Sequence, residues 1–109
     1  MGKGISDDKA EEAVGVIARN ADLIGSLRGQ KAYLEHHLKV ARAQAFLLVS
    51  GTVAEREAIA QTDETVIAKI DEYRDVVTEL ETILTKFKAA ELCIEVWRTQ
   101  AANSRRGHT

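Results

Sequence analysis

Apolar residues recur in steps of three and four along the stretch 66–98, the most regular part of the chain. This spacing is the seven-residue repeat of a coiled-coil helix, in which apolar residues occupy positions a and d. Position g is apolar as well, and an a/d/g face covers about three-sevenths of a helix, which suits a bundle with neighbours on two sides. The assigned residues are Ile70, Val77 and Leu84 at a, Val66, Tyr73, Leu80, Phe87 and Ile94 at d, and Val76, Ile83, Ala90 and Trp97 at g.

A second apolar stripe runs through the N-terminal half of the chain. Its spacing is irregular at one place: a step of three from Ile24 to Leu27 follows another step of three, at the beginning of Gly25–Gly29. The extra step shifts the phase of the stripe. A stammer in one long helix and a short break between two helices both explain the shift. We expect a continuous or kinked helix, because two glycines alone rarely stop a strong pattern. The stripe comprises Ala10, Val14, Ile17, Ala21, Ile24, Leu27, Lys31, Leu34, Leu38, Ala41, Ala45 and Leu48.

Short polar motifs mark where the predicted helices begin and end. Ser6 before two aspartates is typical of a helix start, since its hydroxyl can cap free backbone N–H groups. Ser50-Gly51 is a typical C-terminal stop, and Thr52 with Glu55 fits a capping box. The segment 61–64, which contains Asp63, supplies a second cap. The predicted helices cover 6–49, continuous or kinked at the glycines, 53–60 as a short connector, and 63–102.

Together these elements predict an all-α fold, a long antiparallel helical hairpin with a short connector helix, packed as a coiled-coil-like bundle. We expect a flexible N-terminus at 1–5, a single hairpin domain at 6–102 and a basic disordered tail at 103–109. The extra apolar face calls for a second copy of the hairpin, or for the N-terminal helix folding back if the chain breaks at the glycines. A homo-oligomer is therefore expected.

Composition agrees with long helices, because the 109 residues include no proline and only seven glycines. The net charge of −2 gives no global attraction for nucleic acid. Charge is nevertheless uneven: 28–49 carries four basic residues against one acid, whereas 63–97 carries nine acids against four bases. Helices of opposite sign should attract each other where they pack.

The single cysteine, Cys93, excludes an internal disulfide and favours a reducing, cytoplasmic compartment. No apolar run approaches the length of a membrane span, the longest being the five residues Ala45–Val49. We therefore expect no contact with a membrane.

Two polar residues, Glu91 and Arg98, fall at a positions where apolar side chains are expected. One interpretation is a satisfied polar layer, with a countercharge supplied from 19–28 of the facing helix. The other is a partner-binding end of the bundle, since a tryptophan beside an arginine is typical of interface anchors. The partner-binding residues would be Glu91, Glu95, Trp97 and Arg98.

Basic residues on the N-terminal helix and in the tail offer a second kind of surface. They would contact phosphates without sequence specificity and in a salt-sensitive way. The simpler interpretation is that the acidic helix balances the basic one and that the tail only increases solubility. The candidate nucleic-acid contacts are Arg28, Lys31, Lys39, Arg42, Arg105 and Arg106.

The sequence carries no pattern that indicates catalysis or a cofactor. His36 and His37 are adjacent, so on a helix they point about 100° apart and do not form a metal pair. Cys93, beside the apolar stripe, is expected to be a buried, inert thiol. With no phosphate-binding loop and no nucleophile elbow, we expect no enzyme, no metal, no cofactor and no small-molecule substrate.

Three segments, 55–58, 71–73 and 89–100, carry a resemblance to known proteins. They read Glu-Arg-Glu-Ala, Asp-Glu-Tyr and Ala-Ala-Glu-Leu-Cys-Ile-Glu-Val-Trp-Arg-Thr-Gln. They resemble small helical proteins of tailed bacteriophages, a group without an assigned activity whose genes often lie in early or recombination regions. The similarity covers about 31–106. It implies an accessory role in DNA recombination within the cytoplasm of the host cell.

Three functional hypotheses follow. The first is a non-enzymatic, phage-type helical interaction protein that assists DNA recombination or processing through protein–protein contacts. The second is a direct, non-specific nucleic-acid-binding protein. The third is an inhibitor of a host enzyme or defence complex that imitates nucleic acid with an acidic helix face, formed by Asp71, Glu72, Asp75 and Glu79.

Overall fold

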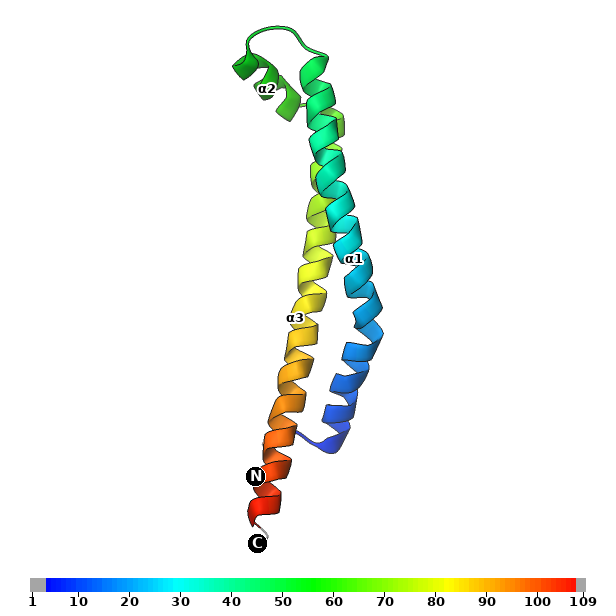
Figure 1. Cartoon of the computed structure of the whole chain (residues 1–109), viewed down its shortest axis with the longest axis vertical. Coiled ribbons are helices and arrows are strands. Elements are labelled where there is room, and N and C mark those ends of the chain that lie inside the picture. The colour runs from blue at the N-terminus through cyan, green and yellow to red at the C-terminus, as the bar shows by residue number, and fades with distance from the viewer. Residues whose placement is uncertain (1–3, 108–109) are drawn as a thin grey trace. The chain divides into compact units, whose positions relative to one another are not determined.

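The computed structural model describes residues 4–107, and this part of the chain contains three helices and no strand (Figure 1). They are α1 (Asp7–Leu47), α2 (Val53–Gln61) and α3 (Glu64–Gly107). The long helices α1 and α3 run antiparallel and pack against each other, and α2 lies in the connection between them. The all-α hairpin with a short connector helix is thereby confirmed.

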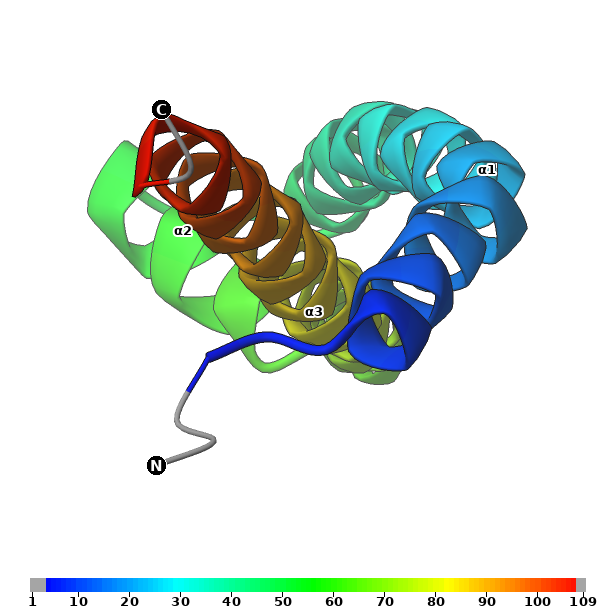
Figure 2. The ribbon, with the colours of Figure 1, turned by 90° about the horizontal axis from the view of Figure 1, so that it is seen from below.

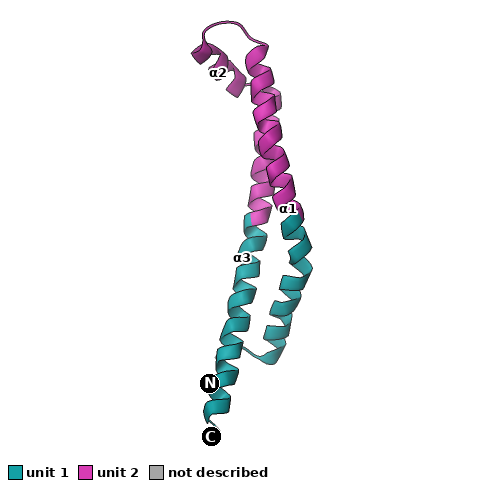
Figure 3. Cartoon of the chain, in the orientation of Figure 1, with its two compact units in different colours: residues 1–25, 81–109 teal, residues 26–80 magenta. Residues whose placement is uncertain are grey.

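The long helices contribute to two compact units, shown in different colours in Figure 3. Unit 1 comprises Met1–Gly25 and Glu81–Thr109, and so pairs the first part of α1 with the last part of α3. Unit 2 is Ser26–Leu80 and contains the rest of both helices together with α2. The hairpin that the sequence predicts as one domain over 6–102 contains both units.

The helix α1 continues through Gly25–Gly29 without a break, as expected, but the predicted shift of phase is wrong. Ala13 is only 6% exposed, whereas Val14, assigned to the buried stripe, is 55% exposed. The inward-facing row contains Ala13 and Asn20, where the sequence predicts Val14 and Ala21. In this row, steps of three and four residues alternate without interruption. The buried or half-buried row on α1 is Ala10, Ala13, Ile17, Asn20, Ile24, Leu27, Lys31, Leu34, Leu38, Ala41 and Ala45.

On α3 the fully buried residues occupy positions d and g of the predicted repeat, whereas at position a Val77 and Leu84 are half-buried and the others are exposed. Ile70 at a is 37% exposed, and Glu91 and Arg98 are exposed as well. These charged residues therefore do not interrupt the packing, and the polar layer expected there is wrong. The buried or half-buried row is Val66, Lys69, Tyr73, Val76, Leu80, Ile83, Phe87, Ala90, Ile94, Trp97 and Ala101.

Small residues of α1 and α2 close the core of unit 2. Ala41 and Ala45 of α1 pack with Ala60 of α2 around Val66, which is fully buried at the start of α3. Leu38 and Phe46 cover this cluster from α1. The connector helix is thus fastened to the hairpin by burial of its last turn.

The predicted helix starts are present with their capping bonds. The Thr52 hydroxyl accepts a hydrogen bond from the N–H of Glu55 at 3.2 Å, and Asp63 Oδ1 accepts from the N–H of Val66 at 3.2 Å. In unit 1 the Ser6 hydroxyl accepts from the N–H of Lys9 at 3.2 Å. Each bond satisfies a backbone donor that the first turn of a helix leaves free.

Both ends of the described chain are more ordered than the sequence predicts. Residues 103–107, predicted as a disordered tail, form the last turns of α3, where two arginines complement the negative end of the helix dipole. Of the predicted flexible N-terminus, 1–3 lie outside the described residues, as do 108–109 of the tail. The N–H of Ile5 donates to Gln100 Oε1 at 2.8 Å, which joins the chain before α1 to α3.

Candidate functional site

The only tryptophan of the chain lies where the first turn of α1 meets α3. The indole Nε1–H of Trp97 donates to Asp7 Oδ1 at 2.7 Å, and the thiol of Cys93, one turn earlier, lies 3.9 Å from the carbonyl oxygen of Lys9. These two contacts set the register of unit 1, in which α1 and α3 lie side by side (Figure 2). Asp7 thereby holds the half-buried indole in one orientation.

Two neighbouring depressions of about 380 Å³ each lie between α1 and α3 in unit 1 and share Ile94. The first exposes Val14 beside Trp97, and in the second Ile17 lies beside charged residues of α3. We call this surface the Ile94 groove. Its lining residues are Asp7, Ala10, Glu11, Val14, Ile94 and Trp97 in the first depression and Ile17, Glu91, Ile94, Glu95 and Arg98 in the second.

All four residues predicted for partner binding are brought together in this groove. The two glutamates and Arg98 line one depression, and Trp97 lines the other. The countercharge expected from 19–28 is not opposite Glu91, because Asp7 pairs with Trp97 and places Ile17 there instead. The predicted register, which paired Glu91 with 19–28 of α1, is therefore wrong.

Sequence reasoning missed the contribution of α1 to the groove. At Asp7 the sequence indicates only a helix start, and its apolar spacing places Val14 in the buried row. The residues of the inward-facing row of α1 are spaced alternately by three and four along the whole helix, and Val14 is not among them. This regular spacing is visible in the sequence when the repeat is followed over all of α1, and it indicates that Val14 is exposed.

The groove combines an apolar floor with an acidic rim. Four carboxylates and one guanidinium border it, which leaves three formal negative charges. The other side of unit 1 is different: its depression has Lys9 and Lys86 with only Glu12, around Ala13 and Cys93. The acidic character therefore belongs to one side of the helix pair.

No protein-family model matches the chain. Comparison with curated proteins finds no significant match, and neither does comparison with solved structures. Function is therefore inferred from the geometry of the described residues.

The candidate nucleic-acid residues are divided between the two units. Arg28, Lys39 and Arg42 are exposed on α1 in unit 2, where Lys31 is half-buried. Arg105 and Arg106 are exposed in the last turn of α3, in unit 1. In unit 2 nine acidic residues outnumber seven basic ones, so no positive surplus is available there.

Three members of the acidic row on α3 are ion-paired along the helix. Arg74 lies 3.5 Å from Asp71 and 3.6 Å from Asp75, and Lys69 lies 3.5 Å from Glu72. These pairs are exposed and local, so they partly neutralise the row proposed to imitate nucleic acid.

A hydrogen bond between α1 and α3 perturbs one ionisable group of unit 2. The Tyr73 hydroxyl donates to Glu35 Oε1 at 2.9 Å. This bond raises the pKa of Tyr73 above its usual 10.0, because ionisation would remove the donated proton. Partial loss of solvent and the negative charge of Glu35 act in the same direction.

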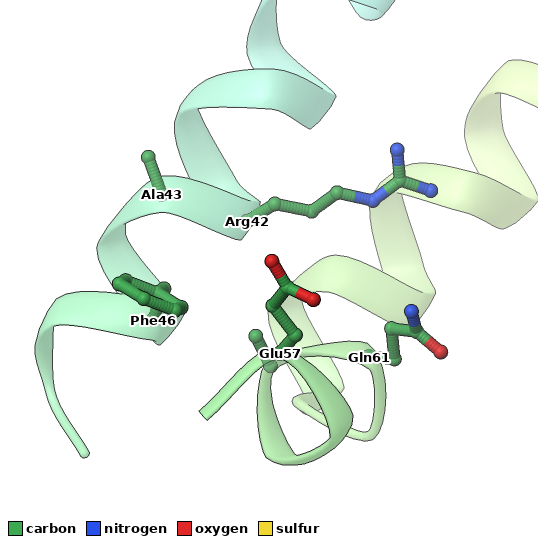
Figure 4. A pocket seen from close by; sticks show the side chains of 6 residues that line it. Arg42, Ala43, Phe46, Glu57 and Gln61 are labelled. Atoms are coloured by element: carbon green, nitrogen blue, oxygen red, sulfur yellow. The ribbon is translucent and has the colours of Figure 1, made fainter. Parts of the chain in front are cut away.

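A further depression, in unit 2, lies between the end of α1 and α2 (Figure 4). Arg42 and Glu57 extend into it beside the ring of Phe46. The guanidinium of Arg56 lies 4.0 Å from the centre of that ring, and its Nε–H donates to the Phe46 carbonyl oxygen at 3.2 Å. These contacts hold α2 against α1, and the depression is the remaining space around them.

The histidines and the cysteine occupy separate places. His37 stacks on Tyr33 with ring centres 4.0 Å apart in unit 2, whereas Cys93 is half-buried in unit 1. Within residues 4–107, no group of three or more His, Cys, Asp or Glu side chains is placed to hold a metal ion. No helix in the same range is long and apolar enough to cross a membrane.

Proposed function

We propose that this chain is a non-enzymatic protein-interaction module that binds another protein through the Ile94 groove. The observation that carries the proposal is the exposure of Val14, at 55%, beside Trp97 and Ile94 in a groove between two packed helices. A half-buried tryptophan surrounded by apolar and charged side chains is the composition typical of binding hot spots.

The local construction of the groove also supports binding. Both walls are α-helices, and the Trp97–Asp7 hydrogen bond orients the largest side chain. A preorganised surface loses less side-chain entropy when a partner binds than a flexible one does. The groove can therefore present a fixed pattern of contacts.

The resemblance to bacteriophage proteins supplies a biological setting for this proposal. The partner would be a DNA-processing protein, and the chain would act as an accessory to recombination in the cytoplasm of the host cell. Direct contact with DNA is not required for this role.

Affinity capture with a pair of matched variants tests the proposal. Val14→Arg places a long charged side chain over the groove, whereas Val40→Arg makes the same change at a valine of α1 in unit 2 that is 37% exposed. Proteins that crosslink to the chain in the cells that produce it are identified by mass spectrometry. Circular dichroism checks that both variants are folded. We expect Val14→Arg to lose the partner and Val40→Arg to retain it.

A variant of the indole provides a second readout. Trp97→Ala removes the anchor and its bond to Asp7, so it should also lose the partner. If folded Val14→Arg and folded Trp97→Ala both capture the same proteins as the wild type, the Ile94 groove is not the binding surface.

A further inference from the structure

We infer that the segment bound in the Ile94 groove is a cationic amphipathic helix of the partner protein. This inference rests on the proposed function and names the chemical class of the partner. It combines the spacing of the apolar side chains in the groove with the charge of its rim.

The apolar floor consists of two pairs of residues, each separated by one helical turn. Val14 and Ile17 lie on α1, and Ile94 and Trp97 lie on α3. Two parallel ridges of this kind form the groove into which a third helix packs in a helical bundle. The occupant would present apolar residues at i, i+3, i+4 and i+7, which is the usual pattern of a helix bound in a groove.

The acidic rim decides the charge of that helix. Asp7 and Glu11 border the groove on α1, and Glu91 and Glu95 border it on α3, against Arg98 alone. Lysines and arginines flanking the apolar stripe of the incoming helix would face carboxylates on both walls. An anionic helix or a nucleic acid would meet repulsion on both walls, and like-charge contacts disfavour wrong partners.

A synthetic peptide and the single tryptophan provide a direct test. The probe is an amidated helical peptide of leucines at i, i+3, i+4 and i+7 with lysines elsewhere, and it contains no tryptophan. Because Trp97 is the only tryptophan of the chain, its emission reports on the groove alone. We expect a saturable blue shift as the peptide covers the indole.

Matched variants of the full chain test first the groove and then the charge of its rim. Val14→Arg should weaken binding by about tenfold or more, the effect expected at a contact hot spot, and Val40→Arg should change it less than about twofold. Glu91→Gln with Glu95→Gln should weaken binding several-fold, and the same double change at Glu55 and Glu57 of α2 should not. Raising the salt concentration should weaken the wild type more than the Glu91/Glu95 variant.

Three results would overturn the inference. The first is equal binding of a peptide with glutamates in place of the lysines, and the second is equal binding of a peptide of the same composition with scrambled order. The third is light scattering that shows wild-type self-association which Val14→Arg abolishes, because a second copy would then occupy the groove.

The outcome is distinguishable from failure of the proposed function. If Val14→Arg loses a captured partner while the cationic peptide does not bind, the groove is an interaction site for a partner of another class. If the peptide binds and the natural partner is captured equally by all variants, the groove has this affinity but is not the site of the cellular interaction, and the proposed function fails.

Discussion

At the scale of single residues, a contact between α1 and α3 changes the pKa of one tyrosine. The hydrogen bond from Tyr73 to Glu35 in unit 2 raises the pKa of the tyrosine. A pKa that is higher in the folded state stabilises the fold below the unfolded value, about 10.0, and this stabilisation is lost as the pH rises through the folded pKa. The bond therefore contributes at neutral pH and disappears in strong alkali.

An alkaline titration checks the state of Tyr73. In a Tyr33→Phe variant, the absorbance of tyrosinate reports Tyr73 alone, since the chain has two tyrosines. We expect a midpoint above 10.0, which falls towards 10.0 when Glu35→Gln is added because the neutral amide no longer favours the protonated phenol. A midpoint that is unchanged by Glu35→Gln would show that the hydrogen bond does not form in solution.

At the scale of helices, the row of α1 that faces inward is decided by packing. Ala13 and Val14 are neighbours, yet the smaller residue is buried and the larger is exposed. Alanine allows close approach to α3, where Ala90 and Cys93 share a depression with Ala13.

Substitution of these two neighbours by the same residue tests the assignment. Ala13→Gln forces a longer polar side chain into the interface and should lower the free energy of unfolding by about 1–3 kcal/mol. Val14→Gln at the exposed position should change it by less than about 0.5 kcal/mol. Urea unfolding measures both, and the reverse order of stabilities would contradict the packing described for α1.

The glycines of α1 give a second test at this scale. Gly25 and Gly29 are exposed, and a Cβ on either would meet nothing within 4 Å. Because alanine is the better helix former, Gly25→Ala and Gly29→Ala should each stabilise the fold by about 0.5–1 kcal/mol.

The control for these variants is Gly51 in the turn before α2. Its φ of +125° lies in the region that favours glycine, and a Cβ there would lie 2.6 Å from Glu55 Oε2. Gly51→Ala should therefore destabilise the fold by about 1 kcal/mol or more. Thermal unfolding compares the three variants, and destabilisation by Gly25→Ala would show that α1 requires a special conformation there.

At the scale of the whole molecule, the apolar surface beside the packed row is relevant to assembly. The a positions predicted as core are not fully used: Ile70 is 37% exposed, and Ile67 next to it is 44% exposed. A homo-oligomer, which the sequence predicts, would cover these two isoleucines of unit 2.

Light scattering tests self-association directly. We expect the wild type at high micromolar concentration to show a mass above the 12.0 kDa of one chain, and Ile70→Lys to lower it because a buried lysine is costly. Leu47→Lys, at a position 72% exposed at the end of α1, is the control and should not lower the mass. A wild-type mass of 12.0 kDa at all concentrations would contradict self-association.

The local features of the fold were predictable from the sequence. The helical class, the continuity of α1 and the caps at Ser6, Thr52 and Asp63 depend on backbone propensities and on side chains within three or four residues. The four residues singled out around Trp97, a tryptophan among charges in an apolar repeat, line one groove, and their role in binding stays a prediction.

Only the tertiary structure decided which rows face inward and what lies opposite them. The repeat of α3 allows both an a/d and a d/g face, and the choice of d/g moves Glu91 and Arg98 from the expected core to the rim of a groove. Likewise, only the pairing of Asp7 with Trp97 places Val14 beside Ile94. The physical reason is that periodicity describes one helix at a time, whereas register and orientation depend on the volumes and hydrogen bonds that two helices present to each other.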